Sequence, residues 1–344
     1  MRHQTSTHQN RASRRFDFTL AGDVDLDIML YGLPEDLPLE RELLAGGMAL
    51  CLGGSSAITA HNLSALGNSV GLITTAAEDS FSDQCQMELR HAGVDLSSCV
   101  PVEHVQTGVT VHLQHQELRH MLTYAGATFN LAYNNLDLDY LADANHFHMA
   151  SYYLQRELTR DIPRLFATLK QAGLTISLDP NDDPDSTWAR GILEALCFVD
   201  VLMPNERETC LIAAEPDLDQ AISVLRQLVP LLVIKRGARG ASAFSATQSW
   251  HVPAYPANVV DGIGAGDSFN AGFLHGWTRG WPIEKALGHG SLTGAWSTTC
   301  SGGTSAFRDQ RSLQDLATKW AETARAEDSM GSATPPTGAL PQQV

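Results

Sequence analysis

The chain has 344 residues, 43% of them hydrophobic, and a formal net charge of −16 at pH 7. This length and composition indicate a globular protein that can bury a core, in one large α/β domain or in two, and they exclude the fibrous and disordered classes. Because non-specific nucleic-acid binding depends on basic side chains that contact phosphates, the acidic balance excludes nucleic acid as an expected partner.

No stretch of the sequence approaches the ~20 consecutive apolar residues of a membrane-spanning helix, so no membrane partner is expected. The six cysteines are scattered without a C-x-x-C pair, which predicts neither a zinc site nor a disulfide framework. A reducing cytoplasm fits this cysteine usage best.

Both ends of the chain are polar. Residues 1–15 carry scattered arginines and lack the apolar core of a signal peptide, and residues 322–344 contain three prolines. Both segments are expected to be flexible tails. The expected folded domain is therefore residues 16–321.

The first expected strand, Phe16–Gly22, alternates apolar and polar residues and opens on an acidic loop. Three carboxylates stand in this loop, at Asp23, Asp25 and Asp27. Such a loop either binds a ligand or is merely solvated, and the residues by themselves leave both interpretations open.

A pair of glycines, Gly53 and Gly54, precedes a helix of small residues that ends at Gly67, a glycine typical of a helix C-terminus. Paired glycines allow another backbone or a ligand to approach closely. Taken alone, the pair is also consistent with a plain turn.

The stretch 107–124 alternates around a polar centre, as a β-hairpin would. It contains His112, His115 and His120 but no H-E-x-x-H motif, so a metal role for these histidines is not favoured. Arg119 in the same hairpin is a candidate for substrate contact, with a solvated or packing role as the alternative.

Between Phe147 and Lys235 the pattern alternates strand and helix, which predicts a parallel α/β sheet. Ligands of such sheets gather at the carboxyl ends of the strands. Three polar motifs follow expected strands there: Asp179-Pro-Asn181, Asn205-x-x-Glu208 and Lys235-x-Gly237-x-x-Gly240. In isolation, the second motif is a common helix start and the third an ordinary turn.

Three glycines follow in close succession, at Gly262, Gly264 and Gly266. They cannot lie inside a helix without a cost of roughly 1 kcal/mol each, whereas residues 268–279 are helix-compatible. The segment therefore predicts a loop and then a helix, whose free N–H groups and dipole form a cradle for an anion. Asp267 in this turn suits an ionised carboxylate that takes a proton, and the alternative is a helix N-cap.

The stretch Val260–Phe269, with its Asp-x-x-Gly-Ala-Gly-Asp core, resembles the C-terminal signature of the ribokinase-like (PfkB) carbohydrate kinases. In that family the last aspartate is the catalytic base and the Gly-Ala-Gly amides form the anion hole for the γ-phosphate. The resemblance assigns these roles to Asp267 and to Gly264, Ala265 and Gly266.

The same resemblance implies an α/β, three-layer ribokinase-like fold. A central, mostly parallel sheet would be flanked by helices, and a small β lid would be contributed by about 32–52 and 107–124. In relatives the lid is often also the surface of a homodimer, so a homodimer through the lid is an expected partner state.

The weaker motifs acquire roles from this family. The resemblance implies that Asp25 and Asp27 bind the sugar and that Gly53 and Gly54 lie against it. Ile58 stands where many relatives place a sugar-binding asparagine, so part of the sugar recognition is expected to differ.

ATP and Mg²⁺ are the implied cofactors, with K⁺ as a further one. The nucleotide ligands implied by the resemblance are Asn181, Asn205, Lys235, Gly237 and Gly240. Glu208 is expected to hold Mg²⁺ through water, because Mg²⁺ keeps several waters and needs few protein ligands. The loop of Asp261 is expected to hold K⁺.

The predicted function is ATP-dependent phosphorylation of a primary hydroxyl of a small neutral sugar, a ketohexose or a pentose. Asp183 stands where sugar-acid kinases of the family carry an arginine, which disfavours an acidic sugar. A nucleoside kinase is the main alternative, ahead of a ketodeoxygluconate-type kinase and a catalytically silent sugar-binding relative. A dinucleotide-binding oxidoreductase is disfavoured because Asp267 replaces the third glycine of G-x-G-x-x-G, and no P-loop motif occurs.

Overall fold

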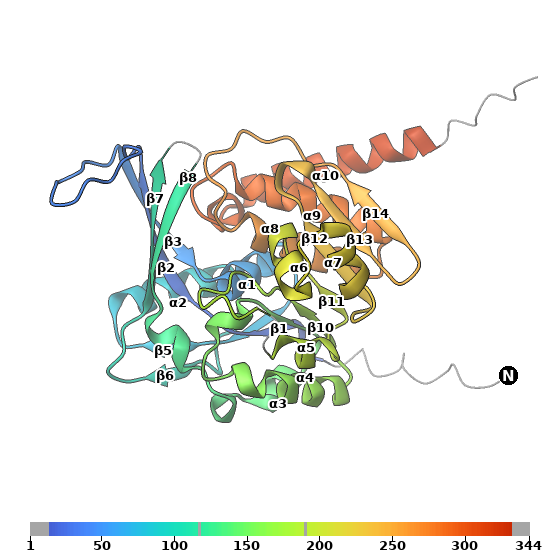
Figure 1. Ribbon diagram of the computed structural model, residues 1–344, viewed down its shortest axis with the longest axis horizontal. Helices are drawn as coiled ribbons and strands as arrows, with labels where there is room; N and C mark the ends of the chain where they lie inside the picture. The colour runs from blue at the N-terminus through green and yellow to red at the C-terminus, as the bar shows by residue number, and fades with distance from the viewer. Residues whose placement is uncertain (1–13, 116–117, 189–190, 332–344) are drawn as a thin grey trace, which may run out of the picture.

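The computed structural model describes residues 14–115, 118–188 and 191–331. A large sheet runs through the molecule with helices on both sides, and a smaller sheet, built by β2, β3, β7 and β8, projects beside it (Figure 1). A two-stranded sheet of β5 (Thr75–Ala77) and β6 (Val100–Val102) completes the strands of the described chain.

The large sheet has eight strands in the order β14-β13-β12-β11-β10-β9-β1-β4. Only the two pairs that involve β13 are antiparallel. The prediction of a mostly parallel sheet is therefore confirmed. Its strands are β1 (Phe16–Ala21), β4 (Val70–Ile73), β9 (Ala144–Met149), β10 (Thr175–Leu178), β11 (Val201–Leu202), β12 (Leu231–Lys235), β13 (Ala241–Phe244) and β14 (Ser249–Val252).

Side chains of these strands alternate between two apolar layers, because successive residues of a strand point to opposite faces. Leu202 and Ile234 pack into one core cluster, whereas Val201 and Val233 pack into the other. The sheet is therefore covered on both faces, as the three-layer prediction requires. The first layer comprises α3 (Leu138–Ala142), α4 (Ile162–Gln171), α5 (Ile192–Leu196), α6 (Glu206–Ala213) and α7 (Leu218–Leu225). The second comprises α1 (Ser55–Ala65), α2 (Ser80–His91), α8 (Ala265–Trp277) and α9 (Ile283–Ser297).

The smaller sheet has the strand order β3-β2-β7-β8, and we call it the lid sheet. The hairpin predicted within 107–124 is present as β7 (Gly108–His115) and β8 (Leu118–Tyr124). The other two strands are β2 (Asp25–Tyr31) and β3 (Gly47–Gly53), so only β3 comes from the expected segment 32–52. The prediction of an acidic loop is wrong for Asp25 and Asp27, because their alternation with apolar neighbours fits a strand with one polar face.

Both ends of the folded chain differ from the expected tails. Arg14 donates a hydrogen bond to the carbonyl of Ala172 at 2.6 Å, and Arg15 forms an ion pair with Asp95 at 2.6 Å. Helix α10 (Gln310–Gly331) continues through 322–331, because its first half packs against the core. The remainder of both predicted tails, 1–13 and 332–344, lies outside the described residues.

None of the six cysteines is in a disulfide. Within the described ranges, no group of three or more His, Cys, Asp or Glu side chains is arranged to hold a metal ion. The helices in the described part of the chain all lack the combination of length and apolar character that crossing a bilayer requires.

Candidate active site

Polar residues that follow β10 and β12 meet at the carboxyl edge of the large sheet. Asp179, directly after β10, forms a buried ion pair with Lys235, the last residue of β12. Asn270 of α8 donates a hydrogen bond to the same carboxylate oxygen. Burial lowers the pKa of Lys235, but attraction to Asp179 and Glu208 outweighs it and raises this pKa overall. The ammonium group therefore stays charged within the site.

Asp267 lies in the first turn of α8, which begins at Ala265 rather than at Ser268. Its side chain is buried. Burial and the nearby Asp179 raise the pKa of Asp267 to about 8, with Lys235 acting in the opposite direction. Burial therefore favours the protonated form of Asp267 in the ligand-free protein, whereas the sequence argument expects an ionised carboxylate. A strongly raised carboxyl pKa beside a charge partner is typical of functional acids and bases.

The glycine-rich turn has backbone geometry that fits the predicted anion cradle. Gly264 caps α8 with a φ of 68°, and a Cβ there would lie 2.4 Å from the Cα of Gly303, so only glycine fits. The first N–H groups of a helix have no intrahelical acceptor, and that of Ala265 makes only a long contact of 3.4 Å within its own loop. A Cβ on Gly266 would lie 3.5 Å from Nζ of Lys235. The start of α8 and a buried ammonium thus lie close together.

A network behind this turn was not indicated by any sequence motif. Asn62 of α1 donates hydrogen bonds to Oγ of Ser268 at 2.9 Å and to the carbonyl of Gly303 at 3.0 Å. Asn62 and Ser268 are 206 positions apart in the sequence. Ile58 packs beneath Gly303, where an added Cβ would lie 2.7 Å from its Cγ2. The residue that departs from the family pattern therefore supports the anion cradle through packing.

The carboxylates of β2 converge on the glycine pair from the lid sheet. Asp25 accepts a hydrogen bond from Oγ1 of Thr128 at 2.7 Å, and burial together with neighbouring carboxylates raises the pKa of Asp25 to about 8. Asp27 lies 3.1 Å from Nε2 of His112 in β7. A Cβ on Gly53 would lie 2.6 Å from the carboxyl carbon of Asp27. The structure thus brings together the predicted sugar ligands and the glycines.

Asp23 has a structural task that the sequence did not indicate. Its carboxylate accepts hydrogen bonds from the N–H groups of Ser55 at 2.9 Å and Ser56 at 3.1 Å, and from the hydroxyl of Ser151 at 3.0 Å. A negative group at a helix start is stabilised by the free N–H groups and the helix dipole. Gly54 has a φ of 85°, and a Cβ there would lie 2.7 Å from the carbonyl oxygen of Asp23, so only glycine fits. Asp23 thus fixes the start of α1 under the acceptor site.

Asn181, which the sequence predicts to be a nucleotide ligand, lies next to Ser55 and Ser151. Its Nδ2 donates to Oγ of Ser55 at 2.6 Å and to Oγ of Ser151 at 3.1 Å. These contacts place it beside the start of α1, whereas the walls of the nucleotide-sized cavity come from other residues.

Asn205 and Glu208 form a capping box at the start of α6. The N–H of Glu208 donates to the Asn205 side chain at 2.9 Å, and the Glu208 carboxylate accepts the N–H of Asn205 at 2.8 Å. The interpretation as a helix start is therefore correct. Burial raises the pKa of Glu208 to about 7, and Lys235 lowers it in part. A carboxylate within electrostatic reach of Lys235 and Asp179 also fits water-mediated contact with Mg²⁺.

A cavity of about 640 Å³ adjoins the cradle, within the range of small-molecule sites. Five predicted residues line it: Lys235, Gly237, Gly240, Ala265 and Gly266. Gly294 of α9 contributes a further wall. The cavity thus joins the predicted nucleotide turn to the anion cradle.

Two other predicted residues lie at the margin of the site or outside it. Arg119 is exposed on β8, and its Nη1 lies beside the Gly262 loop, 3.7 Å from where a Cβ of Gly262 would stand. Asp183 accepts the N–H groups of Asp185 at 3.0 Å and Trp188 at 2.7 Å. Because its carboxylate binds the backbone of its own loop, Asp183 is not available to repel an acidic sugar.

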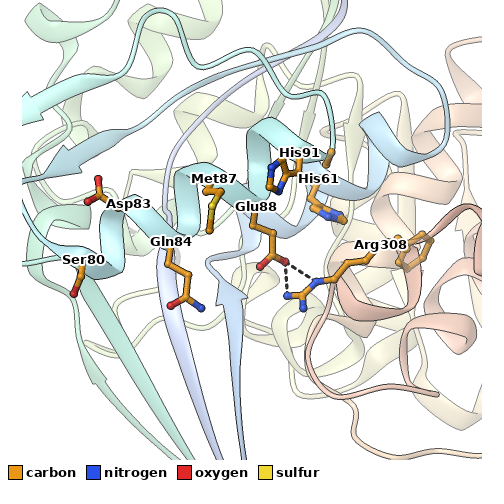
Figure 2. Close-up of a pocket in the computed structure, with 10 residues that line it drawn as sticks. His61, Ser80, Asp83, Gln84, Met87, Glu88, His91 and Arg308 are labelled. Carbon is orange, nitrogen blue, oxygen red and sulfur yellow. Dashed lines mark hydrogen bonds and ion pairs between the residues drawn. The ribbon is translucent and has the colours of Figure 1, made fainter.

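A second cavity, of about 610 Å³, lies between α2 and the segment that ends at Arg308 (Figure 2). Glu88 points toward Arg308 and accepts its Nε at 3.0 Å, and it also accepts Oγ1 of Thr304 at 2.7 Å (Figure 2). His61 contributes to the lining. This cavity contains none of the predicted site residues, but Thr304 directly follows Gly303, which backs the cradle.

Known proteins match most of this chain. The family model for pfkB family carbohydrate kinases matches residues 23–310. The chain is 30% identical over 295 residues to the ATP-dependent ribose-1-phosphate kinase of Halopiger xanaduensis, which covers 83% of this chain and 93% of that protein. It is 30% identical over 283 residues to a fructokinase of Salmonella typhimurium, covering 78% and 92%. A cytidine kinase of Thermococcus kodakarensis is 27% identical over 281 residues, covering 79% and 92%.

A solved structure also shares the fold. An Escherichia coli protein described as a ribokinase II, in complex with ATP and Mg²⁺, has a TM-score of 0.77 and 23% identity, over 88% of this chain and 99% of that chain. This likeness confirms the predicted ribokinase-like fold. With the family match along residues 23–310, the chain belongs to the PfkB family of carbohydrate kinases, phosphotransferases that act on hydroxyl acceptors.

Proposed function

We propose that this kinase transfers the γ-phosphate of MgATP to a primary hydroxyl of a small neutral sugar, a ketohexose or a pentose. The observation that carries the proposal is the meeting of buried Asp267 with the glycine cradle and the charged Lys235. The adjoining cavity, lined by Gly237 and Gly266, gives the nucleotide a place with its phosphates toward this point.

In this proposal Asp267 accepts the proton of the acceptor hydroxyl as its oxygen attacks the γ-phosphorus. The amides of Gly264 to Gly266 and the positive end of α8 stabilise charge on the transferred group. Lys235, kept charged by Asp179, adds a positive side chain beside the cradle. The catalytic contribution is therefore positioning and electrostatic stabilisation, with one proton transfer.

Glu208 and Asn205 are the residues that would organise Mg²⁺ through water. They fit this ion because the Glu208 carboxylate is buried beside Lys235 and is held by Asn205 Nδ2 at 2.5 Å. When bound with ATP, Mg²⁺ neutralises phosphate charge.

The proposed acceptor side favours hydroxyl groups without net charge. Asp25 and Asp27 offer hydrogen-bonding oxygens, and an anionic substrate beside them would make ionisation of these clustered carboxylates still less favourable. Because Asp183 caps its own loop, the preference for a neutral sugar now rests on the carboxylates of β2 alone.

A nucleoside kinase is the second candidate, supported by the similarity to a cytidine kinase. The carboxylates of β2 disfavour both a sugar acid and a phosphorylated sugar, the substrate class named for the Halopiger relative. A catalytically silent relative is disfavoured because Asp267 and the three glycines of the cradle loop are intact.

The substrate proposal predicts the outcome of parallel ATP-consumption assays. With fructose or ribose, we expect kcat/KM to exceed that with ketodeoxygluconate or a sugar phosphate by at least about tenfold, equal to about 1.4 kcal/mol. A preference for an acidic sugar would contradict the electrostatic argument. A preference for cytidine or adenosine would instead favour the nucleoside kinase.

We also propose that K⁺ contacts the loop of Asp261. A carboxylate offers about four lone-pair directions, and three protein donors already use Asp261, namely Ile263, Gly302 and Tyr31. One direction therefore remains for a cation. We expect higher turnover in K⁺ than in tetramethylammonium at matched ionic strength, and equal rates in the two salts would refute this proposal.

A homodimer through the lid sheet is proposed from its outer face. This face exposes apolar side chains of the two edge strands: Leu50 is 41% exposed, Leu122 58% and Tyr124 54%. They are in register with Ile28, Val111 and Val109 of the central strands. Leu122→Asp should convert a dimer to a monomer in light scattering, whereas Met121→Asp, on the opposite face, should not. A monomeric wild type at micromolar concentration would exclude the dimer.

The free cysteines motivate a proposed cytoplasmic location.

A further inference from the structure

The lid sheet touches the catalytic loop through Tyr31, the last residue of β2. The Tyr31 hydroxyl donates a hydrogen bond to Oδ2 of Asp261 at 2.9 Å. Alternate residues of a strand share a face, so Tyr31 projects from the same face of β2 as Asp25 and Asp27. One strand therefore carries the two candidate acceptor ligands and the side chain that contacts the loop.

Asp261 is the hydrogen-bonding centre of that loop. Its carboxylate is buried, and it accepts the N–H of Ile263 at 2.9 Å and the N–H of Gly302 at 3.0 Å. Ile263 directly precedes Gly264, and Gly302 directly precedes Gly303, which lies against Gly264. Asp261 thus orients the backbone on both sides of the cradle.

Cys51 of β3 adds a second contact between the lid sheet and this region, since its thiol lies 3.5 Å from the carbonyl of Ser301.

We propose that Tyr31 is a positioning residue that couples the lid sheet to the anion cradle. Its hydroxyl holds Asp261, and Asp261 holds the backbone that presents the Gly264 and Gly266 amides to the transferred phosphoryl group. This inference rests on the proposed function, because it takes those amides as the anion hole. A residue that acts in this way affects turnover and leaves nucleotide binding intact.

Tyr31→Phe tests the coupling, because it removes the hydroxyl and keeps the ring. Loss of a hydrogen bond to a charged group should lower kcat by about tenfold or more, with KM for MgATP changed by less than about twofold. Tyr133→Phe is the matched control, since Tyr133 packs under Arg164 at 4.3 Å on the opposite helix layer. An unchanged kcat in Tyr31→Phe, or an equal loss in the control, overturns the proposal.

Hydrogen exchange of the ligand-free protein tests the same tether without any substrate. Peptides that cover 259–266 should exchange faster in Tyr31→Phe than in wild type or in Tyr133→Phe. Equal exchange in all three proteins would show that the tether does not order the loop. If wild type phosphorylates no sugar and no nucleoside, the proposed function fails, while the exchange experiment still decides the tether.

A double-mutant cycle shows whether Tyr31 acts through Asp261. Asp261→Asn should lower kcat, and adding Tyr31→Phe to it should cause no further loss, because contacting residues in one network are not additive. Effects that multiply would place the action of Tyr31 elsewhere and overturn the proposed route.

Discussion

Asp267→Asn should yield a folded protein that binds ATP and has lost most of its phosphoryl transfer. The amide keeps the shape of the carboxylate but cannot accept the hydroxyl proton, and loss of a general base costs roughly 10²–10⁴-fold in rate. Thermal stability should not fall, because burial already disfavours the charged form of Asp267 and raises its pKa to about 8. The measurements are kcat with the best acceptor, binding of an ATP analogue and the melting temperature.

Asp217→Asn is the matched control for this substitution. Asp217 caps α7 by accepting the N–H of Gln220 at 2.9 Å, and asparagine caps helices as well as aspartate does. It should therefore retain wild-type turnover. Turnover near the wild-type level in Asp267→Asn would show that another group takes the proton.

The pH profile of the wild type gives an independent measurement of the same base. The ionised carboxylate is the active form, so kcat/KM should rise with pH until about pH 8, where burial and Asp179 place the pKa of Asp267. Below that pH the rate should fall about tenfold per unit, since the protonated fraction grows accordingly. The residual rate of Asp267→Asn should lack this dependence.

The layout of the large sheet and the catalytic turn could be predicted from the sequence because both depend on local patterns. Strand and helix periodicity between Phe147 and Lys235 reports which side chains are buried, and it predicted the parallel strands. The glycine at 264 reports a backbone conformation and a close approach to Gly303 that other residues cannot adopt. Constraints of this kind can be inferred from the type of a single residue.

The contacts that complete the site could not be predicted, since they join residues far apart in the chain. The pairing of Asn62 with Ser268 and the packing of Ile58 under Gly303 depend on how α1 meets α8. The same limit explains the error for Asp25, whose burial between β3 and β7 turns a polar stretch into a strand. Local polarity alone indicated a loop there.

Gly264→Ala should be the most damaging substitution in the cradle that leaves every catalytic side chain in place. At a φ of 68° the alanine itself costs about 1–2 kcal/mol of strain. Its Cβ would also lie 2.4 Å from the Cα of Gly303, a backbone atom that cannot rotate away. The turn must therefore shift, and the amides leave the position where they face the phosphoryl group.

Removal of one oxyanion-hole donor costs about 10²–10³-fold in kcat, and we expect a loss of at least this size for Gly264→Ala, measured below its melting temperature. Gly67→Ala is the control, because Gly67 has a similar φ of 86° with nothing within 4 Å of an added Cβ. The control should lose about 1–2 kcal/mol of stability through strain and keep its kcat. If Gly264→Ala and Gly67→Ala lose stability alike and both keep wild-type turnover, backbone strain is the only effect of the Gly264 substitution. The cradle amides would then not stabilise the transferred group.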